Sequence, residues 1–252
     1  MAKVISVINN KGGTGKTTTV LNLGAALARR NKRVLLLDLD SQCNLTSALG
    51  ISEEQNCVGE ALLGRIPLAE AVMKVGRLSI VPANAALVDS ETQLSNEPGR
   101  EFILREALAD LHDGYDFIVM DCPPSMSVLS INSLVAADHY LVPMQAENFA
   151  FIGLDRILQV AEKVKQRMNP QLELAGILFV KLNPRTNFSR AMIKSLSEDE
   201  RLAGRLFDTY IRQDISLMES GAFHQTVFDY APKGNGSADY GSLAREILKI
   251  YG

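Results

Sequence analysis

The chain has 252 residues and a formal net charge of −3 at pH 7, with 46% hydrophobic and 22% charged residues. This composition is typical of a globular protein and excludes a low-complexity or generally basic chain. Cys43, Cys57 and Cys122 are odd in number, widely spaced and without a CxxC pair, which argues against disulfides and favours a cytoplasmic location. No run of 18 apolar residues occurs, so we expect no membrane-spanning segment.

Short apolar runs alternate with longer stretches of helical periodicity along the whole chain. The predicted strands are 4–8, 34–37, 78–81, 117–120, 140–142 and 177–180. The predicted helices are 16–30, 100–111, 125–136, 153–168, 189–202 and 236–250. Continuously apolar strands between helices indicate a mostly parallel twisted sheet that helices flank on both faces. We therefore expect one α/β domain over residues 1–252, with ligands beyond the carboxyl ends of the strands.

The first predicted strand runs into the glycine-rich string NNKGGTGKTT, residues 9–18, and a helix follows at once. Glycines allow the backbone to fold around phosphate oxygens, and the helix start adds positive partial charge. Lys16 is expected to contact the β- and γ-phosphates, and the Thr17 hydroxyl to complete a Mg²⁺ shell. The pattern predicts a P-loop domain that binds the phosphates of a nucleotide together with Mg²⁺. Its predicted nucleotide-binding residues are Lys11, Gly12, Gly13, Thr14, Gly15, Lys16, Thr17 and Thr18.

One position of this loop departs from the standard P-loop. Asn10 stands where glycine is usual, and a second lysine, Lys11, precedes Gly12. The string KGGTGKTT resembles the deviant Walker A loop of the ParA/MinD group of P-loop ATPases, especially the Soj-like partition ATPases. In that family the extra lysine reaches across a dimer to the partner's nucleotide. The resemblance implies that Lys11 acts in trans, in a homodimer that forms in the ATP state.

Two acidic segments follow predicted strands. The string DLDSQ, residues 38–42, resembles the family's D-x-D-P-Q motif, with Ser41 in place of the usual proline. The resemblance implies that Asp40 positions the attacking water and that Asp38 gives support near the metal. The string FIVMD, residues 117–121, is a Walker B pattern, which predicts that Asp121 binds Mg²⁺ through water. Helix capping is the alternative role for each aspartate.

Weaker matches extend the resemblance to about residue 250. The string QAENF, residues 145–149, resembles the family's dimer-interface segment, and NPRT, residues 183–186, resembles its nucleoside segment. The resemblance implies that Asn183 hydrogen-bonds the adenine, with Pro184 beside it. It further implies a Mg²⁺-dependent ATP hydrolase of weak intrinsic turnover.

The resemblance leaves the cargo of such an ATPase open. It implies an ATP-state dimer that binds non-specific duplex DNA and positions DNA or another large cargo, with hydrolysis stimulated by a ParB-like adapter. The alternative is a MinD-like or scaffold-type switch that positions a protein complex without binding DNA. We expect neither an N-terminal helix-turn-helix domain nor a basic membrane-targeting tail, because the predicted elements begin at residue 4 and end at 250.

The candidate DNA contacts lie near the C-terminus. Residues 181–252 carry 10 basic and 9 acidic side chains, against 16 and 20 in residues 1–180. The candidates for phosphate contacts are Arg185, Arg190, Lys194, Arg212 and Arg245. Three consecutive acidic residues, 198–200, weaken this patch, and a solvated helix face is the alternative. If DNA is the matrix, the expected location is cytoplasmic and nucleoid-associated.

Overall fold

An eight-stranded sheet runs through the part of the chain that the computed structural model describes, residues 1–252 without 53–55, 149 and 252. The strand order is β3-β4-β2-β5-β1-β6-β7-β8. The strands are β1 (Lys3–Val7), β2 (Val34–Asp38), β3 (Met73–Val75), β4 (Leu78–Val81), β5 (Phe117–Asp121), β6 (His139–Met144), β7 (Glu173–Leu182) and β8 (Ile211–Arg212). Neighbouring strands are parallel except for the antiparallel pair β3 and β4.

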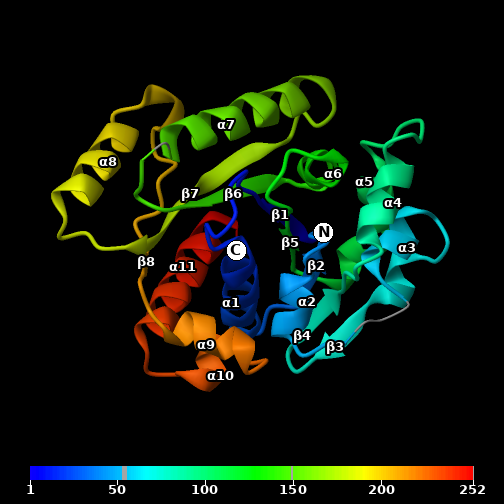
Figure 1. The fold of residues 1–252 in the computed structure, drawn as a ribbon, viewed down its shortest axis with the longest axis horizontal. Helices are drawn as coiled ribbons and strands as arrows, with labels where there is room; N and C mark the ends of the chain where they lie inside the picture. Colours follow the sequence, from blue (N-terminus) through cyan, green and yellow to red (C-terminus); the bar gives the residue numbers. More distant parts are fainter. Residues whose placement is uncertain (53–55, 149, 252) are drawn as a thin grey trace.

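Helices cover both faces of this sheet (Figure 1). They are α1 (Lys16–Ala28), α2 (Asn44–Ala48), α3 (Val58–Leu62), α4 (Leu87–Leu94), α5 (Ile103–Leu108), α6 (Val128–Ala136), α7 (Ala150–Arg167), α8 (Asn187–Ser197), α9 (Ser216–Ala222), α10 (Val227–Tyr230) and α11 (Asn235–Tyr251). Short 3₁₀ helices are η1 (Leu68–Ala71), η2 (Ala109–Gly114) and η3 (Glu200–Leu202). The predicted α/β fold with a mostly parallel sheet is confirmed.

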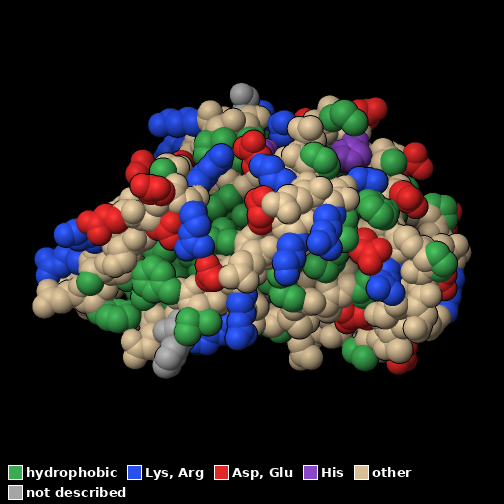
Figure 2. Space-filling view, turned by 90° about the horizontal axis from the view of Figure 1, so that it is seen from above, with side chains coloured by type: hydrophobic (Ala, Val, Ile, Leu, Met, Phe, Trp, Pro, Cys, Tyr) green, Lys and Arg blue, Asp and Glu red, His purple; other side chains and the backbone are tan. Residues whose placement is uncertain are grey.

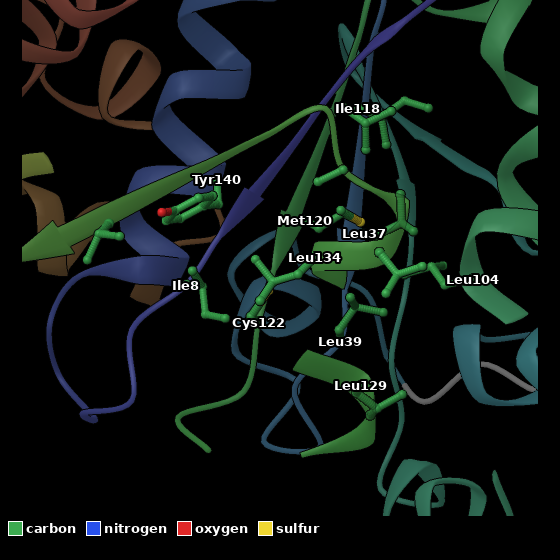
Figure 3. Packing of buried hydrophobic residues seen from close by; sticks show 14 of the residues in the cluster. Ile8, Leu37, Leu39, Leu104, Ile118, Met120, Cys122, Leu129, Leu134 and Tyr140 are labelled. Atoms are coloured by element: carbon green, nitrogen blue, oxygen red, sulfur yellow. The ribbon is translucent and has the colours of Figure 1, made fainter. Parts of the chain in front are cut away.

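The central strands are apolar along their whole length because each face of the sheet meets its own layer of helices. Along β2, Leu35 and Leu37 pack with the layer that contains α3 to α8, whereas Leu36 packs with α1 and α11. All three side chains are fully buried. Figure 3 shows the first layer, where Leu37 lies among side chains that include Leu129 and Leu134 of α6. Each buried leucine contributes roughly 1.5–3 kcal/mol.

Several short elements and helix ends differ from the sequence prediction. β3, β8 and the short helices α2, α3, α4, α9 and α10 lie where no element was predicted. The predicted helix 100–111 divides into α5 and η2, and the predicted helix 189–202 ends at Ser197 before η3 begins. At that break the Asp199 side chain accepts a hydrogen bond from the Arg201 N–H, which caps η3 and separates it from α8.

The parallel strand order brings the carboxyl ends of the inner strands to one edge of the sheet. β1 leads into the phosphate loop, β2 ends at Asp38, and β5 ends at Asp121. Asp38 and Asp121 are direct neighbours in the register of β2 and β5. β6 leads into Gln145, and β8 ends at Arg212. Residues that are far apart in the sequence therefore meet at this edge, as expected for a parallel α/β sheet.

Candidate nucleotide-binding site

A cavity of about 740 Å³ opens at this edge of the sheet. One wall consists of the phosphate loop and the first turn of α1, with Gly12, Gly13, Gly15, Lys16, Thr17 and Thr18. The segment after β2 adds Asp40, and the opposite wall comes from the ends of β7 and β8 and from α9. The volume lies within the range of small-molecule and cofactor sites.

Three glycines of the phosphate loop line this cavity. Gly13 and Gly15 have φ of +76° and +78°, a left-handed conformation that disfavours other residues. Gly15 immediately precedes α1, whose first turn has no side-chain cap. Beside Gly12 an added Cβ would meet nothing within 4 Å. Uncapped N–H groups at the start of a 13-residue helix are suited to bind an anion.

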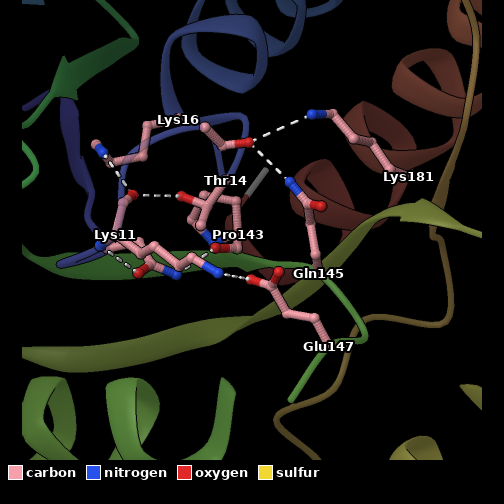
Figure 4. Close-up of polar contacts among 9 residues, drawn as sticks. Lys11, Thr14, Lys16, Pro143, Gln145, Glu147 and Lys181 are labelled. Carbon is pink, nitrogen blue, oxygen red and sulfur yellow. Dashed lines mark hydrogen bonds and ion pairs between the residues drawn. The ribbon is translucent and has the colours of Figure 1, made fainter. Parts of the chain in front are cut away.

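The two lysines of the loop have different surroundings. Lys16 is only 7% exposed and lines the cavity, and its Nζ donates one long hydrogen bond, 3.4 Å, to the carbonyl of Lys11. Lys11 is exposed, and its Nζ pairs with Glu147 Oε1 at 2.6 Å (Figure 4). Neither Lys11 nor Thr14, whose hydroxyl also donates to the Lys11 carbonyl, lines the cavity. Within the loop, Lys16 is therefore the lysine placed to meet a ligand of its own chain.

Hydrogen bonds with residues at the ends of β6 and β7 hold the phosphate loop in place (Figure 4). Asn9 Nδ2 donates to the Pro143 carbonyl at 2.7 Å. Gln145 Nε2 and Lys181 Nζ both donate to the Gly13 carbonyl, at 2.7 and 3.4 Å. The sequence did not predict that Gln145 or Lys181 contacts the loop. Gln145 stood in a segment expected at an interface, whereas nothing in the sequence singled out Lys181.

Asp121 is fully buried at the carboxyl end of β5, near the cavity. Both of its carboxylate oxygens are buried and have no hydrogen-bond partner in the described residues. Burial, and then the charge of Asp38, raise the pKa of Asp121 well above its ordinary value. The nearby Thr17 hydroxyl and the Lys16 ammonium oppose this shift, although Thr17 does not complete a well-formed hydrogen bond.

These residues fit a hydrated Mg²⁺ ion. A divalent cation would compensate the buried carboxylate and supply the partner that its oxygens lack, with the Thr17 hydroxyl as a neighbouring ligand. The described residues contain no group of three or more acidic, His or Cys side chains that could hold a metal by themselves.

Asp38 and Asp40 occupy different environments although they are two residues apart. Asp38 accepts hydrogen bonds from the N–H and hydroxyl of Thr46, at 2.9 and 2.7 Å, and from the Asp40 N–H. Burial raises the pKa of Asp38 to about 6 in spite of these bonds. Because Thr46 lies in the first turn of α2, Asp38 also fulfils the helix-capping alternative. Asp40 is 6% exposed, lines the cavity, and accepts from the Gln42 N–H at 3.0 Å.

The far wall of the cavity is partly apolar. Val180, Ile215 and Met218 contribute to it, together with Arg212. The Arg212 guanidinium is fixed by Asp239, with Nη2 to Oδ1 at 2.6 Å. This pairing raises the pKa of Arg212 and places its charge in the cavity wall.

Asn183 and Pro184 do not line this cavity. The Asn183 side chain is exposed, and its Oδ1 accepts from the Arg185 N–H at 3.1 Å within its own loop. The contact of Asn183 with adenine therefore stays a prediction. Phe149, in the expected interface segment, lies outside the described residues.

The other candidate DNA contacts are exposed. Arg190 and Lys194 lie on α8, where Arg190 donates to Asn187 Oδ1 and Lys194 pairs with Glu198 at 3.7 Å. Arg245 lies on α11 and donates to Ser242 Oγ. Arg185 precedes α8. On the face shown in Figure 2, Lys and Arg side chains are interspersed with Asp and Glu. Arg212 differs from these four residues, because it pairs with Asp239 and lines the cavity.

The chain is similar to known proteins over most of its length. A family model described as AAA domain matches residues 2–174. The chromosome partitioning protein ParA of Myxococcus xanthus is 36% identical over 253 residues, covering 99% of this chain and 89% of that one. The sporulation initiation inhibitor protein Soj of Bacillus subtilis is 36% identical over 251 residues, covering 98% of both chains.

A crystal structure with a similar fold is known. The structure of cobyrinic acid a,c-diamide synthase from Mycobacterium smegmatis with bound ADP and magnesium has a TM-score of 0.87 and 34% identity, covering 100% of this chain and 96% of that one. The family model matches most of the chain, and both relatives are similar over nearly its whole length, so the chain belongs to the AAA-domain family of P-loop ATPases, together with the chromosome partitioning protein ParA and the protein Soj.

Proposed function

We propose that this chain binds ATP with Mg²⁺ and hydrolyses it slowly on its own. The observation that carries this proposal is the unpartnered carboxylate of Asp121 near Lys16, beside the uncapped start of α1. Lys16 and the loop N–H groups bind the phosphates, while Asp121 and Thr17 hold the metal, with Asp38 in support. Bound Mg²⁺ would neutralise charge that develops on the phosphates. Asp40 orients the attacking water.

ATP is proposed to join two copies of the chain. Lys11 is exposed and lies outside the cavity of its own chain, so its ammonium is available to a nucleotide on another copy. Such a contact in trans would add positive charge only in the dimer, as an arginine finger does. ATP binding would then control dimer formation, and an adapter protein of ParB type would stimulate hydrolysis.

The ATP dimer is proposed to bind duplex DNA without sequence preference and so to position DNA or another large cargo. Exposed cations on and before α8, Arg185, Arg190 and Lys194, with Arg245 on α11, are the proposed phosphate contacts. Dimerisation would place two such sets on one assembly and increase the number of released counterions. The relative from Myxococcus xanthus, which is named as a chromosome partitioning protein, supports this assignment.

A mobility-shift assay with non-specific duplex at low salt tests the DNA proposal. We expect a shift with ATP, none with ADP, and an affinity that falls steeply as salt rises. Arg190→Glu should weaken binding, whereas Arg77→Glu on the distant β3–β4 turn should not. ATP turnover without DNA should be the same in both variants. If ATP produces no shift, the chain does not use DNA as its matrix.

A second candidate is a nucleotide switch that positions a protein complex without DNA. The pairing of Lys194 with Glu198 and of Arg212 with Asp239 favours it, because these carboxylates reduce the charge available to phosphates. ATP-dependent dimerisation without a DNA shift would support this candidate. No helix in the described residues is long and apolar enough to cross a bilayer.

A further inference from the structure

Strand β7 contains one extra residue just before its carboxyl end. Phe179 packs with the layer that contains α3 to α8, and Val180 packs with α1 and α11 on the opposite face. Regular alternation would place Leu182 on the same face as Val180, yet Leu182 packs on the other face. Between them, Lys181 has a φ of +51°, and the pairing of β7 with β8 shifts register. Lys181 is therefore the extra residue of a β-bulge.

This bulge turns the Lys181 side chain towards the phosphate loop. Val180 lies against Gly15, since a Cβ added there would be 3.5 Å from Val180 Cγ2. Lys181 lines the same cavity, and its Nζ reaches the Gly13 carbonyl at 3.4 Å (Figure 4). A left-handed backbone is unfavourable for lysine, and bulges often re-aim a side chain beside a functional site.

The charge of Lys181 has no acidic partner. None of the described Asp or Glu side chains forms an ion pair with it, and its hydrogen bond to a neutral carbonyl is long. Two other cations beside the site are paired, Lys11 with Glu147 and Arg212 with Asp239. In the described part of the cavity wall, Lys181 thus resembles Lys16, whose Nζ also has only a long bond to a carbonyl.

We propose that Lys181 is a further phosphate-binding lysine, which contacts the phosphate tail of the nucleotide in its own chain. A phosphate oxygen is a stronger acceptor for the Lys181 ammonium than the Gly13 carbonyl, because the phosphate oxygen carries negative charge and the carbonyl is neutral. The inference rests on the proposed binding of ATP. It adds a contact from β7 to those of the phosphate loop.

Binding measurements with a series of nucleotides test this role. Isothermal titration would compare ATP, ADP and adenosine on the wild-type chain and on Lys181→Gln. We expect Lys181→Gln to weaken ATP and ADP binding roughly tenfold and to leave adenosine binding unchanged, because only the phosphate contact is lost. Lys181→Arg should retain most of the affinity, since it keeps a cation of similar reach.

Two controls separate this contact from a change in folding. Lys74→Gln makes the same substitution on the edge strand β3 and should leave all affinities unchanged. The melting temperature of Lys181→Gln should equal that of the wild type. Equal ATP affinity in Lys181→Gln and wild type would overturn the inference alone, and so would an equal loss for adenosine and ATP. A wild-type chain that binds no ATP would overturn the proposed function as well.

Discussion

The surroundings of Asp40 suit its proposed role of positioning the attacking water. Among the described residues, its carboxylate accepts a hydrogen bond only from the local Gln42 N–H, and it lines the cavity, which leaves its second oxygen for a water. Asp40→Ala should therefore bind ATP with nearly unchanged affinity and hydrolyse it about 10²-fold or more slowly. Single-turnover hydrolysis, measured beside nucleotide binding, checks both parts.

A matched control for this prediction is Asp89→Ala on the exposed surface of α4, which should hydrolyse ATP at the wild-type rate. Wild-type hydrolysis by Asp40→Ala would remove Asp40 from the mechanism. Loss of ATP binding in Asp40→Ala would instead assign it to binding.

Single residues of the site could be predicted where they belong to a local sequence motif. Lys16 and Asp121 follow from the order of strand, loop and helix, and the structure places Lys16 in the cavity wall and Asp121 unpartnered near it. Lys181 and the Glu147 partner of Lys11 could not be predicted, because each depends on how β6 and β7 lie beside the loop. The hydrogen bond of Arg212 to Asp239, 27 residues away, could not be predicted either, because it depends on how β8 and α11 pack together.

At the scale of elements, helix α1 approaches β2 closely because Gly24 has no side chain. A Cβ at Gly24 would lie 2.7 Å from Leu36 Cδ2, and Leu36 is fully buried. Gly24→Ala should lower the free energy of unfolding by about 1–3 kcal/mol, because overpacking outweighs the better helix propensity of alanine. Urea unfolding followed by circular dichroism measures this change.

Gly241 provides the matched control in α11, the helix that lies beside α1. A Cβ there would meet only Arg30 Nη2, at 3.9 Å, so Gly241→Ala should be neutral or stabilising by up to about 1 kcal/mol. If Gly24→Ala is as stable as Gly241→Ala, the approach of α1 to β2 is looser than this structure indicates.

Long, regular elements were predictable, and short ones were not. The inner strands and the helices α1, α6, α7 and α11 are long enough for an apolar pattern to repeat. β8 has two residues, and its position depends on pairing with β7. The helix predicted from residue 125 begins at Val128, because Ser127 is extended and ends the turn after Pro124.

For the whole molecule, the two loop lysines should have separable effects. Lys16→Ala should lose tight nucleotide binding, because a mostly buried phosphate partner disappears from its own cavity. Lys11→Ala should bind ATP as a monomer and fail to dimerise, because its proposed target lies on the other copy. Light scattering with ATP, together with nucleotide binding, distinguishes the two. An Lys11→Ala chain that dimerises normally would refute the role in trans.

If Lys11 acts in trans as proposed, its ion pair with Glu147 would set a concentration threshold for assembly. Its side chains are 57% and 34% exposed, and such pairs contribute roughly 0–1 kcal/mol. Even at the upper value, about one chain in six has Lys11 released at any moment, and a dimer needs two such chains. The pair would then raise the dissociation constant of the dimer by up to roughly fortyfold, and with it the protein concentration needed for dimerisation. Because salt screens an exposed pair, that threshold would itself respond to ionic strength.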